Sequence, residues 1–305
     1  MTELALLIPP VGIGDRILMI PCLKKVKERF GKFDVYYWGE FELPYVHGGR
    51  PEPEFPFFDE REYVKNYRHV DYWHNVENGE VVDLYSEICM LMRSELWERV
   101  KIPEHVSILM LKQLNLEWND DSPEKEIEIK IPQNRVDEYA HFNDYFVIAP
   151  GHYHNPPGRF YSPSIYCELV ERYRKKGIKF ITLSNYSLPY ETETFWTDDF
   201  DQLQMFLKSV RGVVTIDSAV QHYCAALKTK AVVLWGKGAS RPKKYGHKLH
   251  INYFKPTLNY YDDLPTWQSW KIDPVVRFDI DQRKFFKYFE QLIEEPRGKC
   301  QKQHF

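Results

Sequence analysis

A run of β-branched residues that ends in polar ones is the strongest chemical signal in the chain. Val213–Ile216 leads directly into Asp217 and Ser218, and a helix of small residues is expected over 219–227. Open parallel sheets bind their ligands at the carboxyl ends of the strands. The first N–H groups of a helix lack intrahelical acceptors and favour an anion. The pattern therefore predicts a phosphate seat at the start of the expected helix.

A second polar turn lies near the beginning of the chain, between an apolar run and a helical pattern. Gly12 and Gly14 allow another molecule to approach the backbone closely, and Asp15 follows at the start of the expected helix. At that place a carboxylate can cap the helix or serve as a general base over a cleft. The dinucleotide fingerprint G-x-G-x-x-G is broken at Ile17, which disfavours a nicotinamide-dependent reductase, and no Walker Gly-Lys-Ser/Thr follows.

The elements that would position these turns follow from apolar periodicity. Strands are expected at 4–8, 33–38, 126–131, 145–149, 179–183, 213–216 and 231–235. Helices are expected at 16–30 with Pro21 in its early turns, 84–100, 104–116, 163–176 ended by Gly177, 200–209, 219–227 and 283–294, with a short one in 133–142. Residues 44–81 carry only a weak pattern, which predicts loops and short elements.

Strands and helices alternate in both halves of the chain, which is typical of parallel sheets with helices on both faces. A chain of 305 residues is also too long for one ordinary core. The sequence therefore predicts an α/β protein of two Rossmann-like domains whose sheets face a central cleft. We place the boundary within 120–145, giving an N-terminal domain of residues 1–140 and a C-terminal domain of residues 141–305.

The turns resemble, in order and spacing, those of the heptosyltransferase family of GT-B glycosyltransferases. The matching motifs are Gly12-Ile13-Gly14-Asp15 with Pro21, Ala149-Pro150-Gly151, Arg159 with Tyr161, Asp217-Ser218-Ala219-Val220-Gln221-His222, and Val232–Gly236. They cover residues 1–40 and 145–247, whereas 41–144 shows no match. Each motif is weak alone, but together and in order on the expected elements they are fairly specific. The resemblance implies an inverting, metal-independent glycosyltransferase with a nucleotide-diphosphate sugar as donor and no cofactor.

The same resemblance implies roles for individual residues. The N–H groups of Ser218, Ala219 and Val220 would form the anion seat. Asp15 would be the general base that deprotonates the acceptor hydroxyl. The donor-binding residues would be Gly151, Arg159, Asp217, Ser218, Ala219, Val220, His222 and Lys237, with Gly12 and Gly14 allowing close approach. Asp217 would contact sugar or ribose hydroxyls, or cap the helix, or do both. His222 would support the turn, touch the diphosphate, or be a buried structural histidine.

One residue departs from the family pattern, because Ala219 stands where the family has a glycine. An alanine would be strained at positive φ but fits well as the first residue of a helix, and we expect the second case.

A basic loop follows the last predicted strand of this pattern. Its cations are Lys237, Arg241, Lys243, Lys244 and Lys248. They could hold the diphosphate or a polyanionic acceptor, and a solvated basic loop explains them equally well. No Asp-x-Asp motif follows an expected strand, and His152 and His154 make a weak metal signal without a third ligand, so no catalytic metal is expected.

Composition limits the remaining classes of function. The formal net charge is −3 with both signs well mixed, so no global basic field favours nucleic acid or anionic lipid. The five cysteines are widely spaced, and no apolar run approaches the roughly 20 residues of a membrane helix. The start of the sequence carries no basic leader, so a cytoplasmic protein is expected.

The sequence alone leaves alternatives for the acceptor and for whether the protein is catalytic. A saccharide acceptor is what the resemblance implies, and a hydroxymethylated base in DNA, as for phage DNA-modifying glycosyltransferases, is the alternative. DNA binding would show a steep salt dependence, and the slight net acidity counts against it. A non-catalytic nucleotide- or sugar-binding module on the same shell is the alternative from another class.

Overall fold

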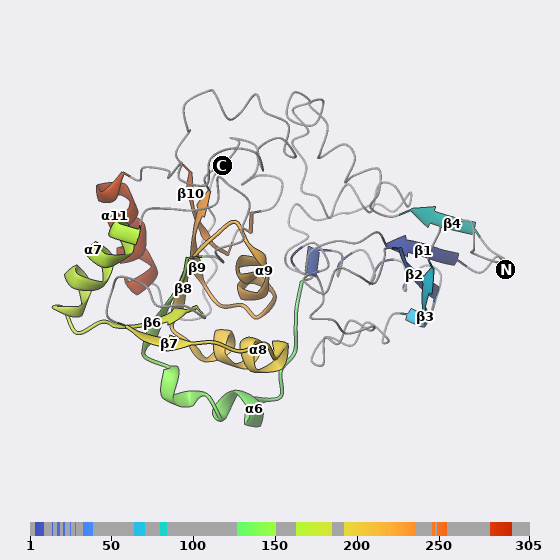
Figure 1. The fold of residues 1–305 in the computed structure, drawn as a ribbon, viewed down its shortest axis with the longest axis horizontal. Coiled ribbons are helices and arrows are strands. Elements are labelled where there is room, and N and C mark those ends of the chain that lie inside the picture. Colours follow the sequence, from blue (N-terminus) through green and yellow to red (C-terminus); the bar gives the residue numbers. More distant parts are fainter. Residues whose placement is uncertain are drawn as a thin grey trace. The chain divides into compact units, whose positions relative to one another are not determined.

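A computed structural model describes residues 4–8, 14, 17–18, 21, 25, 28, 33–38, 64–70, 80–83, 127–150, 163–184, 192–235, 246–247, 249–254 and 281–294. The chain separates into two compact units, Met1–Ile129 and Lys130–Phe305, whose elements are labelled in Figure 1. Residues 130–140, which the sequence analysis assigns to the N-terminal domain, belong to the second unit. The expected helices at 84–100 and 104–116 lie outside the described residues.

The first unit contains a sheet of parallel strands in the order β3-β2-β1-β4. The strands are β1 (Leu4–Ile8), β2 (Phe33–Trp38), β3 (Val64–Val70) and β4 (Glu80–Asp83). β1 and β2 have the predicted bounds. β3 falls where only loops and short elements were expected, because Lys65, Asn66 and Arg68 interrupt its apolar pattern. Polar residues are usual in a strand that ends a sheet, and β3 ends the described one.

A helical stretch follows β1 in the chain. Gly14, Ile17, Leu18 and Pro21 are all helical, and the last three are buried. Gly14 is thus already part of the helix, although the sequence analysis places it in the preceding turn. Pro21 is accommodated within the helical stretch and contributes to its buried face, as expected for a proline in the early turns.

The second unit contains a six-stranded parallel sheet in the order β10-β9-β8-β5-β6-β7. Its strands are β5 (Tyr145–Ala149), β6 (Lys179–Leu183), β7 (Glu193–Phe195), β8 (Gly212–Ile216), β9 (Ala231–Trp235) and β10 (Ile251–Phe254). Counted from β5, this is the 3-2-1-4-5-6 order of doubly wound Rossmann folds. Strand order reverses between β5 and β8, so the ligand crevice of such a fold is expected there.

Helices pack on both faces of this sheet, as predicted. They are α6 (Gln133–Asp137), the 3-10 helix η4 (Ala140–Phe142), α7 (Pro163–Arg174), α8 (Phe200–Ser209), α9 (Ala219–Ala226) and α11 (Gln282–Glu294). In Figure 1, α7 and α11 lie on one side of the sheet, and α8 and α9 lie on the other. None of the helices within the described ranges is both long and apolar enough to span a membrane.

The predicted strand at 126–131 is wrong. Ile127 and Ile129 are buried while Glu128 and Lys130 are exposed, so the alternation that suggested a strand is real. Residues 127–132 nevertheless belong to no strand of either described sheet. Alternating burial alone does not make a strand, because a strand also needs hydrogen bonds to a neighbouring strand.

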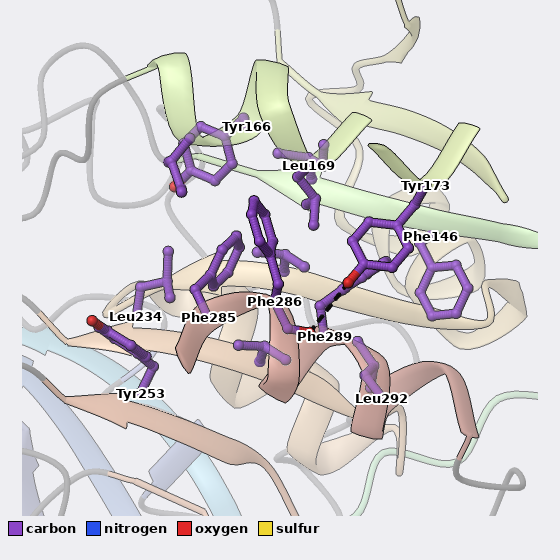
Figure 2. Close-up of a cluster of buried hydrophobic side chains, with 14 of the residues drawn as sticks. Phe146, Tyr166, Leu169, Tyr173, Leu234, Tyr253, Phe285, Phe286, Phe289 and Leu292 are labelled. Carbon is purple, nitrogen blue, oxygen red and sulfur yellow. Dashed lines mark hydrogen bonds between the residues drawn. The ribbon is translucent and has the colours of Figure 1, made fainter. Parts of the chain in front are cut away.

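An aromatic core joins α7 and α11 to one face of the six-stranded sheet (Figure 2). The ring of Phe289 lies 5.2 Å from that of Phe146 on β5 and 4.9 Å from that of Tyr173 on α7. The Tyr173 hydroxyl donates a hydrogen bond to Glu290 Oε1 at 2.8 Å, which satisfies its polar end. The C-terminal helix therefore completes the core under the strands that carry the candidate site.

Candidate functional site

The switch point of the sheet brings two of the predicted motifs to one edge. β5 and β8 are neighbouring parallel strands, with Ala149 opposite Thr215. Parallel neighbours are about 4.8 Å apart, so the residues that follow them leave the sheet side by side. Pro150 follows β5, and Asp217 follows β8. The described part of the motif around Pro150 and the motif of Asp217 therefore begin at the same edge.

Asp217 is held in place by its own helix. It is 7% exposed, and its Oδ1 accepts a hydrogen bond from Gln221 Nε2 at 3.2 Å. The N-cap residue of α9 is Ser218, with φ −151° and ψ 173°, so Asp217 lies one residue before the N-cap position considered for it. Ser218 Oγ lies 3.4 Å from Thr215 Oγ1 and makes no capping hydrogen bond to the helix. Ser218 therefore does not cap the N–H groups of α9 with its own side chain, and the N–H groups of a first helical turn favour an anion.

Ala219 is the first residue of α9, as expected. Among the described residues Lys228 is the sole non-glycine with positive φ, so Ala219 is unstrained. The departure from the family's glycine leaves the backbone of this turn undisturbed. Ala219 and Val220 are half-buried, and their N–H groups belong to the helical turn that lacks intrahelical acceptors.

His222 of α9 belongs to a cluster of three buried histidines. His222 is 5% exposed, and its Nδ1 is 2.8 Å from His247 Nε2, so one of these two nitrogens carries the shared proton. His250 Nε2 donates to the carbonyl oxygen of Gln221 at 2.9 Å. Burial lowers the pKa of His250 to about 4, against the opposing effect of that hydrogen bond. His250 is therefore neutral at physiological pH and supports the helix as a hydrogen-bond donor.

The sequence analysis did not identify His247, His250 or the residues that form hydrogen bonds to them. Asn252 Nδ2 donates to the carbonyl oxygens of His247 and His250, both at 3.2 Å. Asn252 Oδ1 in turn accepts from Trp235 Nε1 at 2.9 Å. These residues lie on and before β10, far from His222 in sequence, and no spacing rule connects them. The burial of His222 agrees with the structural role considered for it.

The remaining predicted site residues are not placed by the structure. Gly12, Asp15, Gly151, Arg159 and Lys237 lie outside the described residues. Gly14 is described as helical and half-buried. The structure therefore brings together Asp217, Ser218, Ala219, Val220 and His222 on one turn and its helix. Within the described ranges no group of three His, Cys, Asp or Glu side chains is arranged to hold a metal ion.

Comparison with known proteins gives matches in structure only. No protein-family model matches the sequence, and a search of curated proteins finds no relative. A glycosyl transferase family 9 structure from Veillonella parvula DSM 2008 matches with a TM-score of 0.60 at 13% identity, covering 96% of this chain and 97% of that one. The E. coli heptosyltransferase WaaC with ADP matches with a TM-score of 0.56 at 11% identity, covering 95% and 100%.

A third solved structure gives the same result. The E. coli ADP-heptose lps heptosyltransferase II matches with a TM-score of 0.54 at 13% identity, covering 95% of this chain and 98% of that one. These matches span nearly the whole of each chain, including the middle segment where no sequence motif could be aligned. The chain therefore has the GT-B fold of these heptosyltransferases, as its sequence motifs predict.

Proposed function

We propose that this chain is a glycosyltransferase that uses a nucleotide-diphosphate sugar and binds the donor diphosphate at the start of α9. The observation that carries the proposal is the point where strand order reverses in a Rossmann-ordered sheet, because there the N-terminus of α9 directly follows a buried aspartate and a Ser218 side chain that makes no capping hydrogen bond. The full-length likeness to heptosyltransferase structures supports the same class of reaction.

The seat at α9 suits the charge that develops on the leaving group. When the bond between the anomeric carbon and the diphosphate breaks, negative charge grows on the phosphate oxygens, and donors already in place stabilise it. The N–H groups of Ser218, Ala219 and Val220 would supply these donors. Arg159 and Lys237 would add positive charge. Asp217 would accept hydrogen bonds from sugar or ribose hydroxyls, with its carboxylate oriented by Gln221.

Asp15 would act as the general base of a single inverting displacement. The acceptor oxygen attacks the anomeric carbon as the diphosphate leaves, and its proton passes to the Asp15 carboxylate. An ordinary aspartate has a pKa of about 3.9 and is a weak base, so this role requires enclosure by protein or substrate. No metal enters the scheme, because the backbone N–H groups and basic side chains would balance the charge of the diphosphate.

Two structural neighbours suggest which donor nucleotide to test. WaaC is solved with ADP, and the heptosyltransferase TibC, in complex with ADP-D-beta-D-heptose, matches with a TM-score of 0.51 at 10% identity over 92% of this chain and 68% of that one. An adenosine diphosphate sugar is therefore the first donor to test. A saccharide hydroxyl is the acceptor that we propose.

Substitution of Asp15 tests the catalytic assignment. Asp15→Asn keeps the size of the side chain and removes its basicity, so we expect transfer to fall by about 100-fold or more. Binding of the nucleotide, measured by calorimetry, should stay within a factor of about two, since the base contacts the acceptor. Asp144→Asn, a change at an exposed carboxylate of the second unit, is the control. Wild-type turnover in Asp15→Asn would show that another group is the base.

A further inference from the structure

Gln221 is a fully buried polar residue of α9 whose side chain reaches back toward the start of its own helix. Its exposed fraction is 0%, and its Nε2 donates a hydrogen bond to Asp217 Oδ1 at 3.2 Å. Asp217 precedes Ala219, the first residue of α9, so the Gln221 amide lies at the N-terminal end of the helix. This buried amide therefore belongs to the proposed donor seat.

Only one side of the Gln221 amide is satisfied. Within the part of the chain that the structure describes, Gln221 Oε1 is buried and accepts no hydrogen bond. The opposite orientation of the amide would place this oxygen against the Asp217 carboxylate, and two acceptors repel each other. The amide therefore keeps its NH₂ group on Asp217, and its oxygen stays without a donor. Buried polar atoms are nearly always hydrogen-bonded, and a binding site is where an exception is expected.

The main chain of Gln221 is held from the sheet. His250 Nε2 donates to the carbonyl oxygen of Gln221 at 2.9 Å, and Asn252 Nδ2 donates to the carbonyl oxygen of His250 at 3.2 Å. Asn252 on β10 also accepts from Trp235 Nε1 at the end of β9. These contacts tie the backbone of Gln221 to two neighbouring strands. A group that is held in place before its ligand arrives gives specificity at little cost in conformational freedom.

Asp217 and Gln221 together offer two acceptor oxygens to one ligand. The two ends of a planar amide are roughly 2.3 Å apart, so Gln221 Oε1 lies at most roughly 5.5 Å from Asp217 Oδ1. Hydroxyl groups reach an acceptor oxygen at roughly 2.7 Å, so two hydroxyls on neighbouring carbons fit this pair. The terminal torsion of a glutamine is broad, which lets the amide turn its oxygen to a hydroxyl bound at the carboxylate. A phosphate offers acceptors in place of donors and does not suit this pair.

We propose that Gln221 is a specificity-determining residue of the donor site, and that Gln221 Oε1 and the Asp217 carboxylate accept hydrogen bonds from two adjacent hydroxyls of the nucleotide sugar. This inference rests on the proposed function, since it takes the donor seat at α9 as given. The ribose of the nucleotide and the transferred sugar both carry such hydroxyls. Loss of the amide should therefore lower affinity only for ligands that carry the hydroxyl pair, whereas damage to the helix would lower affinity for every ligand of the seat.

Gln221→Met tests this role, because methionine has a similar size and lacks the amide. The probes are ADP, 2′,3′-dideoxy-ADP and ADP-heptose, and calorimetry measures their binding to the full chain. If the ribose is recognised, Gln221→Met should weaken ADP binding by about fivefold to tenfold and change the affinity for dideoxy-ADP by less than about twofold. If the transferred sugar is recognised, the variant should bind ADP like the wild type and lose the same factor for ADP-heptose.

Gln204→Met is the matched control. Gln204 on α8 is also 0% exposed, and neither end of its amide has a hydrogen-bond partner among the described residues. The same exchange at this position should leave the binding of all three probes unchanged. A measurement on the wild type needs no variant at all. It should bind ADP at least about fivefold more tightly than dideoxy-ADP, or ADP-heptose at least about fivefold more tightly than ADP.

Three results would overturn the inference while the proposed function stands, because ADP still binds in each. Gln221→Met could weaken all three probes alike, which would make the amide a structural support. It could bind all three probes as the wild type does. The wild type itself could bind all three with equal affinity. A wild type that binds neither ADP nor ADP-heptose would instead overturn the proposed donor and this inference together.

Discussion

Ala219 is the residue at which the proposed diphosphate seat can be altered most cleanly. It is the first residue of α9 and is preceded by the extended Ser218, at φ −151° and ψ 173°. Proline is tolerated at the first position of a helix, and an extended residue before it avoids a clash. Ala219→Pro therefore deletes one N–H of the seat and leaves the helix intact.

We expect Ala219→Pro to weaken ADP binding by about tenfold or more, since a hydrogen bond to a charged group contributes about 1.5–3 kcal/mol. The melting temperature of the free protein should be unchanged. Ala219→Ser retains the N–H and should bind ADP like the wild type, as calorimetry would show. Equal affinity in the proline and serine variants would mean that the diphosphate lies elsewhere.

His250 makes the stability of the second unit depend on pH. Its pKa in the folded protein is lowered to about 4 from the usual 6.5, so between these values the unfolded chain binds more protons than the folded one. Stability should therefore fall as pH drops through this window, by about 2 kcal/mol between pH 7 and pH 5. His250→Gln keeps a donor for the Gln221 carbonyl and removes the titration.

Urea unfolding of wild type and His250→Gln at both pH values isolates this contribution from that of the carboxylates. The difference in unfolding free energy between the two proteins should change by about 2 kcal/mol between pH 7 and pH 5. The ring of His247 lies 5.5 Å from that of His250, so His247→Gln serves as a comparison. Parallel pH curves for wild type and His250→Gln would contradict the lowered pKa.

At the scale of elements, two helices of the second unit are followed by a residue with positive φ, Lys228 after α9 and Gly177 after α7. Lys228→Gly should raise the free energy of unfolding by about 1 kcal/mol, because glycine adopts positive φ without strain. Gly177→Ala should lower it by a similar amount. A side-chain carbon at Gly177 would meet no atom within 4 Å, so this cost is purely conformational. Chemical denaturation measures both, and opposite signs are expected.

The sequence predicts the buried elements of the second unit well and its edges poorly. β5, β6 and β9 have the predicted bounds because a strand covered on both faces is a continuous apolar run. β7 and β10, at the two ends of the sheet, were not predicted, since they are short and partly polar. A local sequence pattern indicates which residues are buried. The position of an edge strand depends mainly on the strand with which it pairs.

The candidate site divides in the same way. The turn from Asp217 to Val220 is local in sequence, so strand, turn and helix could be recognised together. The contact between His222 and His247 joins residues that are distant in sequence. It forms because β10, which follows His247, pairs with β9. Such contacts have no local signal, and only the folded sheet reveals them. Asp15 and Arg159 lie outside the described residues and stay predictions.

At the scale of the whole molecule, the division into two units predicts a division of labour. The six-stranded sheet, the helices on both of its faces and the turn at Asp217 all lie within residues 130–305. Its aromatic core is formed by elements of that unit alone. The general base that we propose, Asp15, belongs to the first unit. Donor binding should therefore be separable from transfer.

Residues 130–305 expressed alone should fold cooperatively and bind ADP within about threefold of the affinity of the full chain, because every proposed donor-binding residue is retained. The fragment should show no transfer to any acceptor, since it lacks the base and the first unit. Circular dichroism and calorimetry measure the first expectation, and an assay for released ADP measures the second. A folded fragment that binds no nucleotide would mean that donor recognition needs residues 1–129, and the seat at α9 alone could not account for it.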